Sequence, residues 1–223
     1  MLQGPKNLAH VGAPVLGLSA DGNRFLVRTP NDVRVYADDG TLVSTIHGAT
    51  DHATLSPQGF EVATTKGDVA QLWDASTGGR VHTLRGHKKR ITDIEYAPDG
   101  RAVLTVSNDH TGLVWSAANG RLLHRLIGHF FPVNSGSYNA NGYWIVTASQ
   151  YTAGLWSAST GQLLFYIGGH TAPLTGATFS SEGDRILTGS EDGTARVYNC
   201  QVCEPLSQLE QLARRRLRRL APR

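Results

Sequence analysis

The sequence predicts an all-β fold made of five copies of one short unit. Three glycine–histidine pairs recur at intervals of 42 and 41 residues, at Gly86-His87, Gly128-His129 and Gly169-His170. Aromatic residues keep the same period at Trp73, Trp115, Trp156 and Tyr198, and turn glycines keep it at Gly59, Gly100, Gly142 and Gly183. Gly22 and Tyr36 mark an earlier, shorter copy. Because a fixed period of roughly 20–50 residues is typical of stacked repeats, we expect the units to pack against one another.

The clearest unit contains four expected strands separated by turn residues. Pro98-Asp99-Gly100 predicts the first turn, and Asn119-Gly120 predicts a hairpin that tolerates positive φ. The strands are expected at residues 91–96, 102–106, 113–115 and 122–126. Four short antiparallel strands form one blade of a β-propeller, whose two apolar faces must be covered by neighbouring blades. The predicted fold is therefore a propeller of five four-stranded antiparallel blades.

Composition sets the broad class of the protein. Of its 223 residues, 40% are hydrophobic and 17% are charged, which is typical of a folded soluble chain. There is no run of about 20 apolar residues that would span a bilayer, and residues 1–10 lack the pattern of a secretory signal. Two cysteines cannot form a disulfide framework, which agrees with a reducing compartment. We therefore expect a cytoplasmic protein.

The unit boundaries leave the last blade incomplete. The five units are expected at about residues 10–47, 48–85, 86–127, 128–168 and 169–203, followed by a tail at 204–223. After Tyr198 no hairpin glycine introduces a fourth strand. We predict that Leu2 to Ala9 supplies this strand and closes the ring, because an open ring exposes apolar faces and strand edges. The alternative is a fragment of a larger ring that self-associates.

These repeats resemble the WD-repeat family. The resemblance rests on Gly86-His87 at the start of a unit, Ser107-Asn108-Asp109 in its middle, and Trp73-Asp74 as the dipeptide that names the family. It covers about residues 9–199, although only the second unit carries Trp-Asp itself. The resemblance implies a propeller that binds other proteins.

Recurring polar residues suggest two different roles. His87, Ser107 and Asp109 are the ingredients of a catalytic triad, but His170, Ser190 and Asp192 repeat the set 83 residues later, and a hydrolase needs only one site. The family resemblance instead implies a buried structural network within each blade. Its expected members are His87, Ser107, Asp109, Trp115, His129, Ser149, Trp156, His170, Ser190, Asp192 and Tyr198. The fourth unit is expected to be broken, since Tyr151 stands near its Asp position.

The segments after each Gly-His pair are candidates for partner binding. The resemblance places these segments and the second-to-third-strand turns on the face that family members use for binding. The candidate residues are Lys88, Lys89, Arg90, Phe130, Phe131 and Tyr151. Adjacent basic and aromatic side chains favour a protein or peptide with acidic and apolar groups. The alternatives are a solvated turn for the cations, a core contact for one Phe, and sequence drift with packing for Tyr151.

The carboxyl-terminal segment differs in character from the repeats. Residues 204–223 hold six Arg against two Glu, with leucines at roughly helical spacing, which predicts a short amphipathic helix. Its expected role is packing; binding an anionic membrane or nucleic acid is the alternative. Cys200 and Cys203 have the spacing of half a zinc site or a redox pair, but no second pair of ligands completes it. The pair followed by this helix is similar to the end of bacterial WD-repeat proteins whose propeller is a sensor.

The functional prediction is a non-catalytic scaffold or sensor that binds proteins through its loop face. We expect no cofactor, no metal and no small-molecule substrate. The competing hypothesis is an enzyme with a site in the central channel. That hypothesis requires one unrepeated cluster of carboxylates or metal ligands there, and the sequence pattern shows none.

Overall fold

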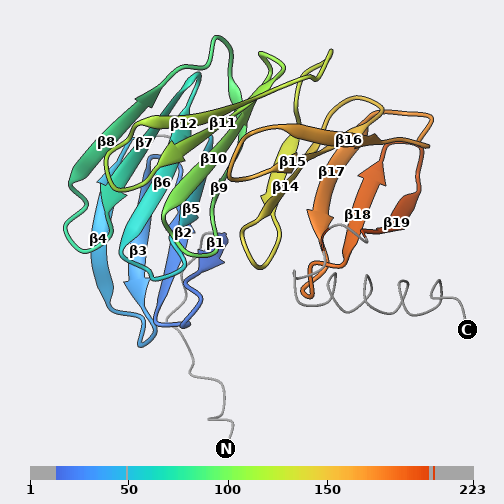
Figure 1. Cartoon of the computed structure of the whole chain (residues 1–223). Helices are drawn as coiled ribbons and strands as arrows, with labels where there is room; N and C mark the ends of the chain where they lie inside the picture. The colour runs from blue at the N-terminus through green and yellow to red at the C-terminus, as the bar shows by residue number, and fades with distance from the viewer. Residues whose placement is uncertain (1–13, 49, 201–202, 204–223) are drawn as a thin grey trace, which may run out of the picture.

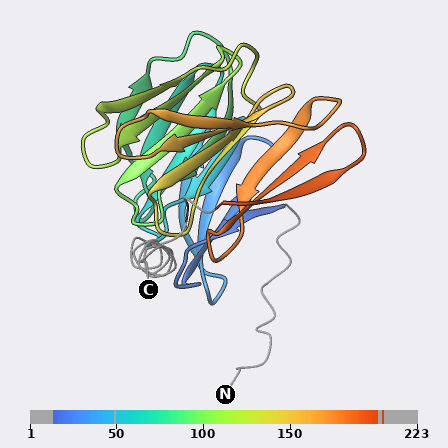
Figure 2. The same cartoon turned by 45° about the vertical axis from the view of Figure 1, so that its right-hand side comes forward.

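The computed structural model describes residues 14–48, 50–200 and 203 as five antiparallel sheets. In an arc, the chain passes from the blue first sheet through the green third to the orange fifth (Figure 1), and the turned view brings the orange fifth sheet forward (Figure 2). The all-β prediction with five repeated sheets is confirmed. In the described residues, no helix is long and apolar enough to cross a membrane.

Each sheet follows the chain from an inner strand to an outer one. The first sheet comprises β1 (Val15–Leu18), β2 (Arg24–Arg28), β3 (Asp32–Ala37) and β4 (Leu42–His47). The second comprises β5 (His52–Leu55), β6 (Glu61–Lys66), β7 (Val69–Asp74) and β8 (Arg80–Arg85). The third comprises β9 (Ile91–Tyr96), β10 (Ala102–Ser107), β11 (Thr111–Ser116) and β12 (Leu122–Ile127).

The last two sheets differ in their number of strands. The fourth comprises β13 (Ser135–Tyr138), β14 (Trp144–Ala148), β15 (Ala153–Ser157) and β16 (Leu163–Ile167). The fifth has three strands in the described residues, β17 (Leu174–Phe179), β18 (Arg185–Ser190) and β19 (Ala195–Asn199). The prediction that no fourth strand follows Tyr198 stays a prediction, because most of the later residues lie outside the described part of the chain.

The hydrophobic core is divided into layers between neighbouring sheets. Ile91 and Leu113 of the third sheet pack with Leu72 of the second, while Leu104 of the third packs with Ile145 of the fourth. Similar layers join the first sheet to the second and the fourth to the fifth. The second, third and fourth sheets thus bury both faces against their neighbours, which is why the repeat must stack.

The two ends of the arc leave apolar side chains in solvent. Leu18 on β1 and Leu187 and Val197 on β18 and β19 are exposed, so nothing in the described residues covers them. The predicted closing segment, Leu2 to Ala9, and the predicted helix at 204–223 both lie outside the described residues. Ring closure and self-association therefore stay predictions.

Cys200 and Cys203 form a disulfide at the end of the fifth sheet. Both are buried in the core layer between the fourth and fifth sheets. The Cys-x-x-Cys spacing alone does not predict this bond, because the same spacing also suits a metal site or a free thiol pair.

Candidate functional site

A buried hydrogen-bonded relay crosses the third sheet from its loop end to its core. His87 Nε2 and Trp115 Nε1 both lie 2.9 Å from the hydroxyl of Thr105. Burial lowers the pKa of His87, against an opposing effect of Asp109. With a neutral imidazole, Trp115 donates to Thr105, Thr105 donates to Nε2, and Nδ1–H donates to Asp109, so each member is satisfied.

The hydroxyl that joins His87 to Trp115 belongs to Thr105, which was not among the expected network members; Ser107, which was, bonds to the amide of Asp109 instead. Thr147 and Thr188 occupy the same position, each 18 residues after its histidine, as Thr105 is. This shared spacing in the sequence is the signal that identifies the threonines. The position two residues later lies nearer the loop end of the strand, where a β-bulge interrupts the pairing of β10 with β9, and its hydroxyl bonds to the Gly-His loop.

Ser107 joins the Gly-His loop to the turn after β10. Its hydroxyl donates to the carbonyls of Lys89 and Arg90 at 2.9 Å, while the amide of Asp109 donates to it at 3.0 Å. Ser149 and Ser190 repeat this contact to Pro132 and Pro173, at 2.9 and 3.1 Å. These serines therefore hold each Gly-His loop against the adjacent strand-connecting turn.

Asp109 connects the relay to the loop surface. One carboxylate oxygen accepts from His87 Nδ1 at 2.9 Å and from the amide of Lys88 at 2.8 Å, and the other accepts from Thr111. Burial opposes ionisation of Asp109, but the hydrogen bonds from Thr111, Lys88 and His87 outweigh it and lower the pKa of the carboxyl. The ionised Asp109 thus fixes the first residue of the basic segment.

The fourth sheet keeps the relay but lacks its acidic end. His129 Nε2 and Trp156 Nε1 each lie 2.7 Å from the Thr147 hydroxyl. In the described part of the chain no carboxylate pairs with His129, and burial lowers the pKa of this histidine to about 4. Tyr166 packs beside the imidazole instead, with ring centroids 5.9 Å apart.

The fifth sheet keeps histidine, threonine and aspartate but not the aromatic member. His170 contacts Asp192 at 2.8 Å and Thr188 at 2.9 Å. The predicted role of Tyr198 in this network is wrong, because its hydroxyl donates to the carbonyl of Gly168 at 3.1 Å.

All six candidate partner-binding residues are exposed on the loop face, defined as the Gly-His loops with the turns between second and third strands. Lys88, Lys89 and Arg90 follow β8, and Arg90 contacts Asp51 at 3.1 Å. Lys88 and Lys89 form no ion pair within the described residues. The turn after β10 bonds to both neighbouring loops, since Asn108 donates to Arg90 and Val133 donates to Ser107.

The aromatic part of the loop face belongs to the fourth sheet. Phe130 is 83% exposed, and Phe131 meets Tyr151 edge to face with ring centroids 6.4 Å apart. Neither phenylalanine is a core contact, so that alternative is wrong for both. Three aromatic side chains, exposed on adjacent loops, form an apolar surface next to the basic segment.

One residue of the loop face has an unusual backbone. His110, in the turn after β10, has a φ of 74°, while the residues with positive φ in the corresponding turns of the second and fifth units are Gly67 and Gly193, with φ of 62° and 80°. A left-handed conformation is costly for a residue with a Cβ. The turn therefore retains a strained histidine where glycine is the unstrained choice.

The repeated units match a known family of sequences. The family described as "WD domain, G-beta repeat" matches residues 78–116, 120–157 and 161–199, which is more than half of the chain. The chain belongs to the WD-repeat family. The three matched segments coincide with the strands that carry the relay residues Thr105, Thr147 and Thr188.

Several WD-repeat relatives align with parts of the chain. Protein tipD of Dictyostelium discoideum is 33% identical over 89 residues, 40% of this chain and 14% of the relative. An uncharacterized WD repeat-containing protein of Synechocystis, sll1491, is 26% identical over 144 residues, 64% of this chain and 40% of the relative. COMPASS component SWD3 of Saccharomyces cerevisiae is 32% identical over 98 residues, 44% of this chain and 31% of the relative. The aligned region spans less than half the length of each relative.

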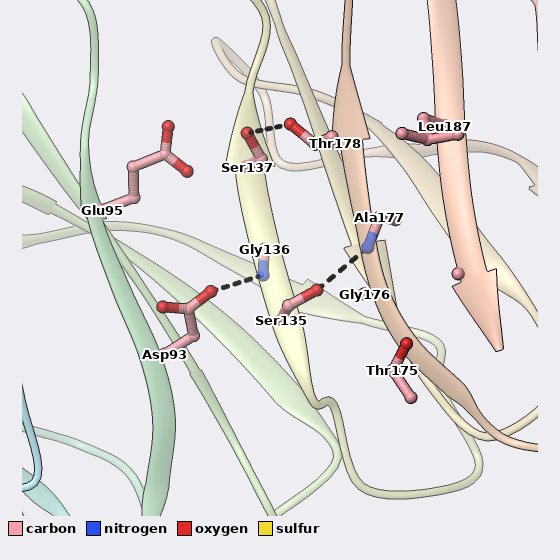
Figure 3. A pocket seen from close by; sticks show the side chains of 11 residues that line it. Asp93, Glu95, Ser135, Gly136, Ser137, Thr175, Gly176, Ala177, Thr178 and Leu187 are labelled. Atoms are coloured by element: carbon pink, nitrogen blue, oxygen red, sulfur yellow. Dashed lines mark hydrogen bonds between the residues drawn. The ribbon is translucent and has the colours of Figure 1, made fainter. Parts of the chain in front are cut away.

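The inner strands of this WD-repeat chain also carry a pair of carboxylates. Asp93 and Glu95 lie on β9 and line a cavity with residues of β13 and β17 (Figure 3). The interpretation that the channel has no unrepeated carboxylate cluster is wrong at these two positions. In the described residues, no group of three or more His, Cys, Asp or Glu side chains is placed to hold a metal ion.

Proposed function

We propose that this chain is a non-catalytic WD-repeat scaffold that binds a protein or peptide through its loop face. The observation that carries the proposal is the exposure of Phe130, Phe131 and Tyr151 together on adjacent loops. Exposed aromatic side chains held on a rigid framework bury much apolar area on binding at little cost in side-chain entropy. The relay and the serine contacts supply that framework.

The loop face favours a partner with both acidic and apolar groups. Lys88 and Lys89 stand exposed without an acidic partner in the described residues, and their loop is held by Asp109 and Ser107. Charge-assisted contacts at this end orient a ligand, and the aromatic end anchors it. A short acidic segment carrying one or two apolar side chains fits both halves.

The relatives support a scaffold role by their names. One is subunit I of eukaryotic translation initiation factor 3 in Bombyx mori, and another is a component of COMPASS. Both names describe members of larger assemblies. The relay residues do not support hydrolysis, because each histidine and its hydroxyl are buried within a blade and the set recurs in several sheets.

The test is capture of partners from cell extract by the immobilised chain, quantified by mass spectrometry. The variant Phe130→Ser/Phe131→Ser removes the aromatic anchors, and Lys88→Glu/Lys89→Glu reverses the basic end. Phe60→Ser is the matched control, because Phe60 is 68% exposed but lies in the turn between β5 and β6, at the opposite end of the sheet.

The proposal predicts that partners captured by the parent are retained by Phe60→Ser and lost by at least one loop-face variant. Equal capture by the parent and both loop-face variants would place the binding surface elsewhere. Circular dichroism of each variant establishes that the fold is kept.

A further inference from the structure

The inner strands line an open cavity that is separate from the loop face. Its volume is about 410 Å³, within the range of pockets that bind small ligands or single side chains. The strands β9, β13 and β17 each contribute to its wall (Figure 3). Its polar side chains are two carboxylates, Asp93 and Glu95, and four hydroxyls, Ser135, Ser137, Thr175 and Thr178.

The carboxylates occupy positions where the fourth and fifth sheets have small neutral residues. Asp93 is equivalent to Ser135 and Gly176, and Glu95 is equivalent to Ser137 and Thr178, at the repeat intervals of 42 and 41 residues. Asp93 accepts from the amide of Gly136 at 3.2 Å.

In the fourth sheet, a serine accepts the hydrogen bond that Asp93 accepts in the third. Ser135 accepts from the amide of Ala177 at 3.1 Å. The link between inner strands therefore does not require a carboxylate, since a serine hydroxyl accepts the equivalent hydrogen bond.

Keeping two carboxylates here is electrostatically costly. They lie two residues apart on one strand, and so on the same face of the sheet. Burial, and then the charge of Asp93, raise the pKa of Glu95 to about 7, while burial raises the pKa of Asp93. From the other elements, His52 lowers the pKa of Asp93, and Ser137 and the amide of Tyr138 offset part of the effect on Glu95. Neither carboxylate has a Lys or Arg partner in the described residues.

We propose that this cavity binds an organic cation, a primary ammonium or a guanidinium, between Asp93 and Glu95 on one wall and the hydroxyls of β13 and β17 on the other. Two carboxylates and four hydroxyls supply acceptors for the several N–H donors of such a group. An anion would be repelled. A quaternary ammonium would find no aromatic side chain among the lining residues. A divalent metal would lack a third carboxylate or imidazole in the described part of the chain.

The test follows backbone amide shifts of Gly136 and Ala177 by NMR in the full chain during titration with defined probes. N-acetyl-lysine methylamide and N-acetyl-arginine methylamide present the cation as a partner's side chain would. Putrescine presents it as a free amine. The neutral isosteres, N-acetyl-norleucine methylamide and N-acetyl-citrulline methylamide, are the controls for shape.

Two variants test the site in different ways. Glu95→Gln removes one charge, and Glu182→Gln removes an exposed carboxylate in a turn of the fifth sheet as the matched control. Gly176→Val fills the cavity without touching the carboxylates, because a Cβ at Gly176 meets only the Ser135 hydroxyl, at 3.7 Å. The amide spectrum of each variant reports whether the fold is kept.

We expect at least one cationic probe to shift both amides, with the affinity reduced about tenfold or more by Glu95→Gln and by Gly176→Val. Binding should strengthen from pH 6 to pH 8 as Glu95 ionises. Stronger binding of the capped amino acids than of putrescine would identify a partner's side chain as the source, and the reverse would identify a free amine. Equal binding of the neutral isosteres, full affinity in Glu95→Gln, or no shift with any cation would overturn the proposal. None of these outcomes depends on the loop face.

Discussion

The third and fourth sheets share one buried relay and differ at its surface end. In both, a threonine hydroxyl joins a histidine to a tryptophan. In the third, Asp109 caps the histidine and fixes the following loop. In the fourth the turn is one residue shorter, since Thr147 and Trp156 are 9 residues apart against 10 for Thr105 and Trp115, and no aspartate caps the histidine in the described residues.

This difference separates two structural roles, the alignment of strands within a sheet and the fixing of the loop that follows the histidine. The His–Thr–Trp relay aligns strands within a sheet and persists without its acidic end. The aspartate belongs to the loop, and where it is lost the loop carries exposed aromatic side chains in its place. We infer that the fourth sheet exchanged a stabilising cap for an apolar recognition surface.

The largest expected effect follows loss of the relay hydroxyl. Thr105→Val keeps the side-chain shape but leaves the N–H of Trp115 and Nε2 of His87 without partners, which should cost about 3 kcal/mol of unfolding free energy. Thr147→Val should cost a similar amount, because the fourth relay has the same hydrogen bonds. Urea unfolding measures both, with Thr→Ser at each position as the control. Valine variants as stable as their serine counterparts would show that the relay hydrogen bonds do not stabilise the fold.

Removing the cap should have a smaller effect, confined to the third sheet. Asp109→Ala leaves Nδ1 of His87, the amide of Lys88 and Thr111 without their acceptor, and should lower the unfolding free energy by about 2 kcal/mol. Because the folded-state pKa of Asp109 is lowered, its contribution is present above the unfolded-state pKa and is lost as pH falls through the folded value. The difference between parent and variant should therefore shrink in acid. A difference that grows in acid would contradict the assigned charge state.

Acid should lower the unfolding free energy through His129 of the fourth sheet, whose imidazole pairs with no carboxylate in the described residues. The pKa of His129 is lowered to about 4 in the folded chain, against an ordinary value of about 6.5, so the unfolded chain binds the proton first as pH falls. At pH 5.5 this should cost about 1.4 kcal/mol relative to pH 8. Chemical denaturation at both pH values should show a weaker dependence for His129→Asn. An unchanged dependence would mean that other groups carry the acid sensitivity.

The smallest effect is expected at the strained turn of the third sheet. His110→Gly removes about 1–2 kcal/mol of left-handed strain but adds chain entropy to the unfolded state, so the net gain should be roughly 0.5 kcal/mol. Gly193→Ala in the fifth sheet should do the opposite, because its φ of 80° suits only glycine. Differential scanning calorimetry gives both shifts. A destabilised His110→Gly variant would show that the histidine makes contacts that outweigh its strain.

The repeat, its strands and its exposed loop residues could be predicted from the sequence because each leaves a periodic signal. The relay hydroxyl could not be assigned to Thr105 from the motif alone, since Thr105 and Ser107 stand two residues apart on one strand and both carry a hydroxyl. Only the structure shows which of the two the histidine reaches. Tyr198 stands at the tryptophan position of the repeat, yet its hydroxyl bonds to the carbonyl of Gly168 and not to the network. The cavity of Asp93 and Glu95 could not be predicted, because these residues are not repeated in the sequence. Only the stacking of β9 beside β13 and β17 brings them to a shared cavity.

The most direct test of the exchange between cap and recognition surface measures stability and partner capture in the same two variants. Asp109→Ala should lower the unfolding free energy while the folded protein still captures its partners at low temperature. Phe130→Ser should leave the unfolding free energy within about 0.5 kcal/mol of the parent and lose capture. The reverse pattern, with stability lost in Phe130→Ser and binding lost in Asp109→Ala, would contradict the separation of framework from recognition surface.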